Sequence, residues 1–311
     1  MRPVPERLAT IDVGTNTVLL LVAEREGGKL RAVCERAEIT RLGRGVDATG
    51  QLQPEAIRDT VAVLAGYAAE ARALGARDIA CVATSAARDA RNGADFFAAA
   101  RAAADLSPEV ISGDEEARLV YLTAWRDFGG GGDGRPLAVL DVGGGSTEFI
   151  VGEGMAPRDR VSLQAGAVRL TERHVRADPL PPAELAALRA ATRAALDPLG
   201  ALPPGPGARL VGVAGTVTTL SAVIQALPRY DGQKVHGSSL SLAQVEELVE
   251  RLAGLSVAAR AALPGMEPKR ADVIVAGALV VAEAMRRTGF EALTVSDRGV
   301  RWGLLYDRFG A

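Results

Sequence analysis

The sequence predicts an α/β protein of two similar lobes, and three glycine turns carry this prediction. An apolar, strand-like run ends at Asp12-Val13-Gly14 and continues into hydroxyl-bearing residues and a second apolar run. The same order recurs at Asp141-Val142-Gly143, 129 residues further along the chain, and a third glycine turn follows at 211–216. Strands mixed with helices in two similar halves indicate a duplicated α/β fold with a cleft between its lobes.

The glycine turns also have the residue types that bind phosphate. Successive bare N–H groups in such a turn form a concave anion site, and hydroxyl groups add donors. The expected phosphate-binding residues of the turns are Gly14, Thr15, Asn16, Thr17, Gly143, Gly144, Gly145, Ser146, Thr147, Gly215 and Thr216. Three such turns are typical of the actin-like phosphotransferase fold of sugar kinases, Hsp70 and actin, a duplicated ribonuclease H-like unit. Ordinary hairpin turns are the alternative, but they do not explain why Asp ends both apolar strands.

Carboxylates beside the turns predict a divalent cation. Asp141 and Glu148 flank the second turn. Asp12 has the same position before the first turn that Asp141 has before the second. Carboxylate oxygens are ligands that Mg²⁺ accepts while keeping several waters. Mn²⁺ accepts the same oxygens, so the choice between the two metals stays open. Phosphate donors next to metal-binding acids suggest a polyphosphate substrate.

In the first half, a sheet and its covering helices are expected. The predicted strands lie at 8–13, 18–25, 30–38, 79–83 and 109–111, and the predicted helices at 54–74, from about 84, and at 112–125. Apolar residues repeat at helical spacing in 54–74, where Pro54 suits the first turn and Gly75 the end.

In the second half, the glycine run at 129–132 is read as a flexible connector. It sets the expected lobes at 1–127, together with a C-terminal helix at about 298–311, and at 128–297. Strands are predicted at 137–140, 149–151 and 292–295, helices at 183–197, 216–226, 241–254, 269–287 and 300–309, and a loop at 198–207.

Composition limits the possible functions of the 311-residue chain. Its net charge is −2, so no basic field attracts nucleic acid, and no apolar run reaches the ~18 residues of a membrane span. The N-terminal segment is too polar for a signal peptide. Cys34 and Cys81 lack metal or disulfide spacing, which indicates buried thiols in a reducing cytoplasm. A homodimer is the default assembly.

A helix start at Ser112 has three acids, Asp114, Glu115 and Glu116, in its first turn. Acids there can simply complement the helix dipole. Alternatively, one carboxylate orients water against a bound phosphate, because phosphoryl transfer needs mainly positioning and charge neutralisation. Both interpretations stay open on the residues alone.

Together these motifs resemble the exopolyphosphatase and guanosine pentaphosphate phosphohydrolase (Ppx/GppA) family, in its short two-domain form. The matching segments are 12–17, 83–92, 111–118, 141–148, 212–216, 269–277 and 295–297. The resemblance implies an actin-like fold, Mg²⁺ between the lobes and hydrolytic release of terminal phosphate. It implies a catalytic role for Glu116 rather than Glu115, phosphate binding by Arg88, and metal-linked roles for Asp141 and Glu148.

Three departures from the family bear on the substrate. Leu19 stands where members often carry a polar residue, the late motif is Gly299-Val300-Arg301-Trp302-Gly303, and the chain ends at Ala311 without the helical domain of long members. We therefore expect short-chain inorganic polyphosphate as the substrate. The alternatives are a guanosine pentaphosphate (pppGpp) phosphohydrolase with ppGpp as its related ligand, an actin-like kinase, and a non-catalytic polyphosphate or alarmone sensor. His174 and His236 are read as structural.

Overall fold

The computed structural model describes residues 6–129 and 134–310, which divide into two compact units. Unit 1 comprises the chain up to Leu119 and again from Val300, and unit 2 comprises Val120–Gly299. The sequence predicts these boundaries at residue 127 and at about residue 298. The glycine connector predicted there has residues 130–133 outside the described chain.

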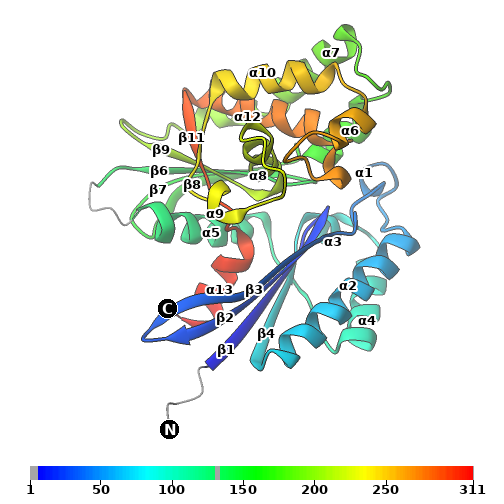
Figure 1. Ribbon diagram of the computed structural model, residues 1–311, viewed down its shortest axis with the longest axis vertical. Helices are drawn as coiled ribbons and strands as arrows, with labels where there is room; N and C mark the ends of the chain where they lie inside the picture. The colour runs from blue at the N-terminus through cyan, green and yellow to red at the C-terminus, as the bar shows by residue number, and fades with distance from the viewer. Residues whose placement is uncertain (1–5, 130–133, 311) are drawn as a thin grey trace. The chain divides into compact units, whose positions relative to one another are not determined.

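Unit 1 is built on a five-stranded sheet in the order β3-β2-β1-β4-β5 (Figure 1). The strands are β1 (Glu6–Val13), β2 (Thr17–Glu26), β3 (Lys29–Ile39), β4 (Ala76–Ala83) and β5 (Glu109–Val110). The first three pair antiparallel, and β4 and β5 continue the sheet in parallel. The helices are α1 (Val46–Thr49), α2 (Pro54–Ala73), α3 (Ser85–Asp89), α4 (Gly93–Ala104), the start of α5 (Gly113–Ala124) and α13 (Val300–Phe309).

The two faces of this sheet bury different partners because side chains alternate along a strand. Ile11, Val13 and Leu20 pack in the core that α2 and α4 close. Leu8 and Leu21 on the other face pack against Trp302 and Leu305 of α13. The predicted strands and the helix at 54–74 are confirmed. Helix α4 was not predicted; its buried stripe, Gly93, Phe96, Ala100 and Ala104, consists mostly of small residues.

Unit 2 repeats this topology. Its six-stranded sheet has the order β10-β11-β9-β6-β7-β8, so the run β8-β7-β6-β9-β11 matches β3-β2-β1-β4-β5 in order and direction. The strands are β6 (Leu137–Val142), β7 (Thr147–Glu153), β8 (Ala156–Leu163), β9 (Arg209–Val213), β10 (Ser239–Ser241) and β11 (Ala292–Val295). The predicted duplication and α/β class are confirmed, with β10 as an addition.

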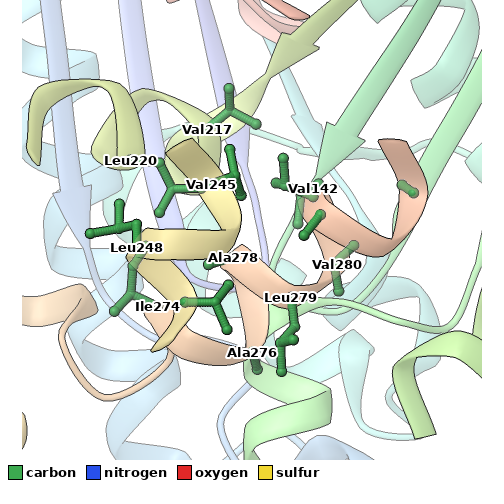
Figure 2. Close-up of a cluster of buried hydrophobic side chains, with 14 of the residues drawn as sticks. Val142, Val217, Leu220, Val245, Leu248, Ile274, Ala276, Ala278, Leu279 and Val280 are labelled. Atoms are coloured by element: carbon green, nitrogen blue, oxygen red, sulfur yellow. The ribbon is translucent and has the colours of Figure 1, made fainter. Parts of the chain in front are cut away.

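Most helices of unit 2 contribute to one large hydrophobic core. The helices are η1 (Trp125–Gly129), α6 (Ala167–His174), α7 (Pro182–Ala195), η2 (Asp197–Ala201), α8 (Ala214–Ile224), α9 (Gly232–Val235), α10 (Leu242–Ala253), α11 (Val257–Ala261), η3 (Pro268–Arg270) and α12 (Ile274–Thr288). Figure 2 shows Val217 and Leu220 of α8, Leu248 of α10 and Ile274 and Leu279 of α12 in one buried cluster. Residues 274–285 of α12 are all buried in this core, and the charged residues Arg286 and Arg287 follow in its last turn.

Two sequence predictions for unit 2 differ from the structure. The helix predicted at 269–287 is two elements, η3 and α12, and the segment predicted as a loop at 198–207 begins within the 3₁₀ turn η2. The third glycine turn joins strand β9 to helix α8, which confirms the helix predicted at 216–226. Among the described residues, no helix is long and apolar enough to cross a membrane.

Candidate functional site

The first two glycine turns have the same backbone geometry. In the hairpin β1–β2, Val13 pairs with Val18, and the Gly14 N–H donates to the Thr17 carbonyl at 3.0 Å. In β6–β7, Val142 pairs with Thr147, and the Gly143 N–H donates to the Ser146 carbonyl at 3.1 Å. Gly14 and Gly143 therefore shape the turns with their N–H groups and do not offer them to a ligand.

The second turn presents a row of aligned N–H donors. The carbonyl oxygens of Gly143, Gly144 and Gly145 accept hydrogen bonds of 2.9–3.2 Å from backbone N–H groups of residues 166–169, at the start of α6. In a trans peptide the carbonyl and the following N–H point in opposite directions. The N–H groups of Gly144, Gly145 and Ser146 therefore point together, away from α6. Aligned N–H groups of this kind form a backbone nest, a geometry that can bind an anion.

Two residues that the sequence did not reveal hold this nest. Gly166 lies so close beneath the turn that an added Cβ would be 2.2 Å from the Gly144 oxygen. The Arg169 Nε donates to the Gly145 carbonyl at 2.7 Å. Their link to the turn depends on β8 and α6, which fold back over it, so no local pattern could have revealed it. The hydroxyl of Thr147, predicted as a phosphate donor, instead donates to the Ala165 carbonyl at 2.8 Å.

The first turn is supported in the same way. The carbonyl of Thr15 accepts from the Gly43 N–H at 2.8 Å, and that of Asn16 accepts from the N–H groups of Thr40 and Arg41 at 3.1 Å. By the same peptide geometry, the N–H groups of Asn16 and Thr17 point away from this loop. Unit 1 therefore carries a smaller version of the nest in unit 2.

The third turn is covered by a guanidinium group. Ala214 begins α8 with φ of +69°, a left-handed conformation that is uncommon for alanine and marks local strain. An added Cβ on Gly215 would be 1.3 Å from Nη1 of Arg270, so the Arg270 side chain occupies the space that Gly215 leaves. Burial lowers the pKa of Arg270, and nearby Glu267 opposes that shift. Arg270, which was not predicted as a site residue, thus places a cationic group at the turn that holds the predicted residues Gly215 and Thr216.

The predicted metal acids of unit 2 lie together. Asp141 and Glu148 are directly opposite each other across the β6–β7 pair, with residue exposures of 6% and 1%. Opposite residues on an antiparallel pair have Cβ atoms about 4.5–5.5 Å apart. The Ser162 hydroxyl on β8 donates to Glu148 Oε1 at 2.7 Å.

These two carboxylates fit a magnesium ion that also binds substrate phosphate. Mg²⁺ is usually held by one or two carboxylates together with phosphate oxygens and waters. No group of three or more His, Cys, Asp or Glu side chains suited to a metal occurs in the described part of the chain. In such a site Asp141 and Glu148 would supply the protein ligands, and phosphate oxygens would complete the coordination.

The third predicted metal acid, Asp12, has different surroundings in unit 1. Asp12 lies opposite Leu19 across the β1–β2 pair. Leu19 therefore has the position in the first hairpin that Glu148 has in the second. Burial raises the pKa of Asp12 to about 7, and the charge of Arg301 acts against this rise. Asp12 Oδ1 is buried and accepts no hydrogen bond among the described residues. A cation or a proton would satisfy this oxygen.

Arg88 and Glu116 form an ion pair in unit 1. The Arg88 Nη1 donates to Glu116 Oε2 at 3.3 Å and to the Ile111 carbonyl at 2.9 Å. β4 and β5 run parallel, so α3, which carries Arg88, and α5, which carries Glu116, begin at the same edge of the sheet. The side chains of Arg88 and Glu116 are 22% and 10% exposed. The family motifs identified both residues as site candidates, but the sequence did not predict that they contact each other.

Glu115 faces elsewhere. Its carboxylate accepts from Arg118 Nε at 2.9 Å and Nη2 at 2.8 Å, and Arg118 also binds Asp307 of α13 at 2.6 Å. Glu115 is therefore part of a structural ion-pair network, whereas Glu116 is paired with the predicted phosphate-binding arginine. His236 accepts at Nδ1 from the Asp297 N–H at 3.3 Å and packs on the Phe128 ring, contacts that fit a structural residue.

Comparison with known proteins places these features in a family context. The model of the Ppx/GppA phosphatase family matches residues 21–310. Exopolyphosphatase 2 of Mycobacterium tuberculosis is 41% identical over 312 residues, covering 96% of this chain and 97% of that protein. Exopolyphosphatase 1 of the same organism is 32% identical over 302 residues, covering 96% and 87%. A crystal structure of an Aquifex aeolicus Ppx/GppA protein is similar with a TM-score of 0.82 and 32% identity, covering 98% of both chains.

Proposed function

The chain belongs to the Ppx/GppA phosphatase family, and on that premise we propose that it is a metal-dependent exopolyphosphatase. It would release the terminal orthophosphate of inorganic polyphosphate by hydrolysis. The observation that carries the proposal is the pairing of Glu116 with Arg88 in a unit whose first turn offers aligned N–H donors. This unit supplies a carboxylate for water and two kinds of donor for phosphate.

The chain's own residues account for the reaction. The N–H groups of Asn16 and Thr17 and the Arg88 guanidinium would bind oxygens of a phosphate group. Glu116 would accept a proton from the attacking water as its oxygen bonds to the terminal phosphorus. The phosphoanhydride bond breaks, and the leaving chain, shortened by one phosphate, keeps the bridging oxygen. Phosphoryl transfer gains most from positioning and charge stabilisation, which such donors provide.

The divalent cation would be held by Asp141 and Glu148. Such a bound cation would supply neutralisation of the charge that develops on the phosphate oxygens. The aligned N–H groups of Gly144, Gly145 and Ser146 would hold phosphate oxygens beside these acids. Asp141 and Glu148 are nearly inaccessible to water, so a bound cation would offset the cost of burying these two carboxylates in ionised form.

The Arg88–Glu116 pair suggests how substrate prepares the base. Without phosphate, the guanidinium binds the carboxylate and shields it. A phosphate group would compete for the same guanidinium donors, since Arg binds phosphate oxygens in a bidentate way. The Glu116 carboxylate oxygen that Arg88 releases would then accept a hydrogen bond from water.

We propose short polyphosphate chains as the preferred substrate. Long chains need a track of cations, whereas this protein has a net charge of −2 and carries Leu19 beside Asp12. Leu19 is half-buried on β2 and shares the sheet face of Asp12. A reducing cytoplasmic location accords with the free, buried thiols Cys34 and Cys81. A homodimer is the expected assembly, which light scattering would measure.

A phosphate-release assay with a substrate panel tests the proposal. Tripolyphosphate and tetrapolyphosphate should exceed chains of several hundred units in kcat/KM at one fixed ionic strength, because salt screens multi-phosphate binding. Release of phosphate without any acceptor would exclude a kinase. A tenfold advantage for guanosine pentaphosphate would make the alarmone phosphohydrolase the main function, and saturable binding without product would indicate a sensor.

A further inference from the structure

A fully buried arginine, Arg260, joins three segments of unit 2. It lies on α11 and is 1% exposed. Its Nε donates to the Leu252 carbonyl at the end of α10 at 2.7 Å, and its Nη1 donates to the Ala271 carbonyl at 3.2 Å. Its Nη2 lies 3.7 Å from Asp178 Oδ1, whose carboxylate also accepts the Val257 N–H at the start of α11. Arg260 therefore fixes the position of the backbone at Ala271.

Ala271 directly follows the arginine that covers the third glycine turn. The segment from Leu263 to Val273, which we term the strap, runs along α8. Gly265, with φ of +81°, lies so close to α8 that an added Cβ would be 2.2 Å from the Ala222 oxygen. Further along the strap, the Arg270 guanidinium lies against Gly215 at the first turn of α8. The strap thus touches α8 near both ends.

Overall stability does not explain the burial of Arg260 well. Burial lowers the pKa of its guanidinium, with the charges of Asp178 and Asp272 acting against that shift. Ion pairs in such surroundings are often no better for stability than well-packed apolar residues. What an apolar residue could not do is hold two carbonyl groups of separate segments in fixed positions. This requirement indicates that Arg260 serves to position these backbone segments accurately.

We propose that Arg260 is a positioning residue that holds the strap so that Arg270 meets phosphate at the Gly215 turn. The inference rests on the proposed function, since it takes that turn to bind substrate phosphate. Arg260 itself is buried away from solvent and would act only through Arg270. Without its bond to the Ala271 carbonyl, the strap between Gly265 and α12 would lose a fixed point next to Arg270.

A double-mutant cycle tests this chain of action. Arg260→Met keeps an apolar stem and removes the three polar contacts, and Arg270→Gln removes the cation at the turn. Arg260→Met should raise the KM for tripolyphosphate by roughly tenfold, the effect of one lost charge-assisted hydrogen bond, with kcat nearly unchanged. In the Arg270→Gln background, Arg260→Met should have no further effect on KM. Arg193→Met, which removes an ion-paired arginine of α7 in the same unit, is the matched control and should leave KM unchanged.

Equal effects of Arg260→Met in both backgrounds would overturn the proposal, because a general structural role does not depend on Arg270. If Arg260→Met does not melt cooperatively, Asp178→Asn replaces it in the cycle and should show a smaller coupling of the same sign; no coupling there would also overturn the proposal. If the wild type releases no phosphate, the proposed function fails. Calorimetric binding of tripolyphosphate in the same four proteins then still decides the role of Arg260.

Discussion

The guanidinium of Arg88 lies 3.3 Å from the carboxylate of Glu116, and this ion pair joins two residues that are 28 positions apart in the sequence. The pair puts a candidate phosphate-binding group and a candidate base within one hydrogen bond of each other. Glu115, the adjacent residue, is committed to Arg118 instead. The two adjacent acids therefore have different partners in the structure, Arg88 for Glu116 and Arg118 for Glu115.

Glu116→Gln should lower kcat for phosphate release by roughly 10²–10⁴-fold, because glutamine keeps the size of the side chain but cannot accept the proton. Binding of tripolyphosphate, measured by calorimetry, should persist. Glu115→Gln is the matched control on the same helix, and its kcat should stay within about twofold of wild type, since Glu115 pairs with Arg118 in a partly exposed ion pair that contributes little to stability. If the effects of the two variants are reversed, Glu115 is the base.

Ser162→Ala should weaken binding of Mn²⁺, used as a probe for Mg²⁺, by about 10–100-fold in calorimetry. The Ser162 hydroxyl orients Glu148, which faces Asp141 across the hairpin. Asp141→Asn should reduce affinity further because it removes a ligand charge. Ser241→Ala, which removes an N-cap of α10, should leave metal affinity unchanged. Unaltered Mn²⁺ binding in Asp141→Asn would place the metal elsewhere.

Gly166→Ala should reduce kcat/KM and destabilise the protein by about 1–3 kcal/mol, since the new methyl group would collide with the Gly144 carbonyl. Moving that carbonyl also turns the N–H groups of the nest. Gly66→Ala is the control, because a Cβ at this position of α2 meets no atom within 4 Å. It should stabilise the protein by about 0.5–1 kcal/mol without changing kcat/KM. Thermal melts and phosphate release measure both effects.

Glu283→Gln should destabilise the protein at neutral pH and have a smaller effect in acid. Burial alone would raise the pKa of Glu283, but hydrogen bonds from Arg193 and Arg189 outweigh it and hold the pKa below the usual 4.5. A lowered folded-state pKa contributes stability that is present above pH 4.5 and is lost as the pH falls through the folded value. Urea unfolding from pH 7 to pH 3 should show the two proteins converging. A constant difference would contradict an ionised Glu283.

Asp12→Asn should remove a pH dependence of stability whose sign is opposite to that of Glu283. Burial raises the pKa of Asp12 from 3.8 to about 7, so its contribution to stability is fully present below pH 3.8 and is lost as the pH rises through about 7. In chelator, the free energy of unfolding of wild type should fall over this range relative to Asp12→Asn. Parallel profiles would show that Asp12 is already ionised in the folded protein.

The sequence by itself determined the duplicated architecture and the location of its hairpin turns. Asp, glycine and hydroxyl residues follow each other directly in both halves, and hairpin geometry depends mostly on such adjacent residues. The 129-residue repeat therefore predicted the equivalence of Asp12 and Asp141. The strand register shows that Leu19 and Glu148, which lie opposite these residues, are equivalent positions too. The family motifs likewise identified Glu116 and Arg88 as candidates.

Only the tertiary structure decided which of these groups meet and what holds them. Arg88 contacts Glu116, Gly166 lies beneath Gly144, and Arg270 covers Gly215, each across a long stretch of chain. Such contacts arise when parallel strands bring distant loops to one sheet edge and when a later segment folds over an earlier turn. No local period encodes them, because they depend on the packing of whole elements rather than on the spacing of residues within one.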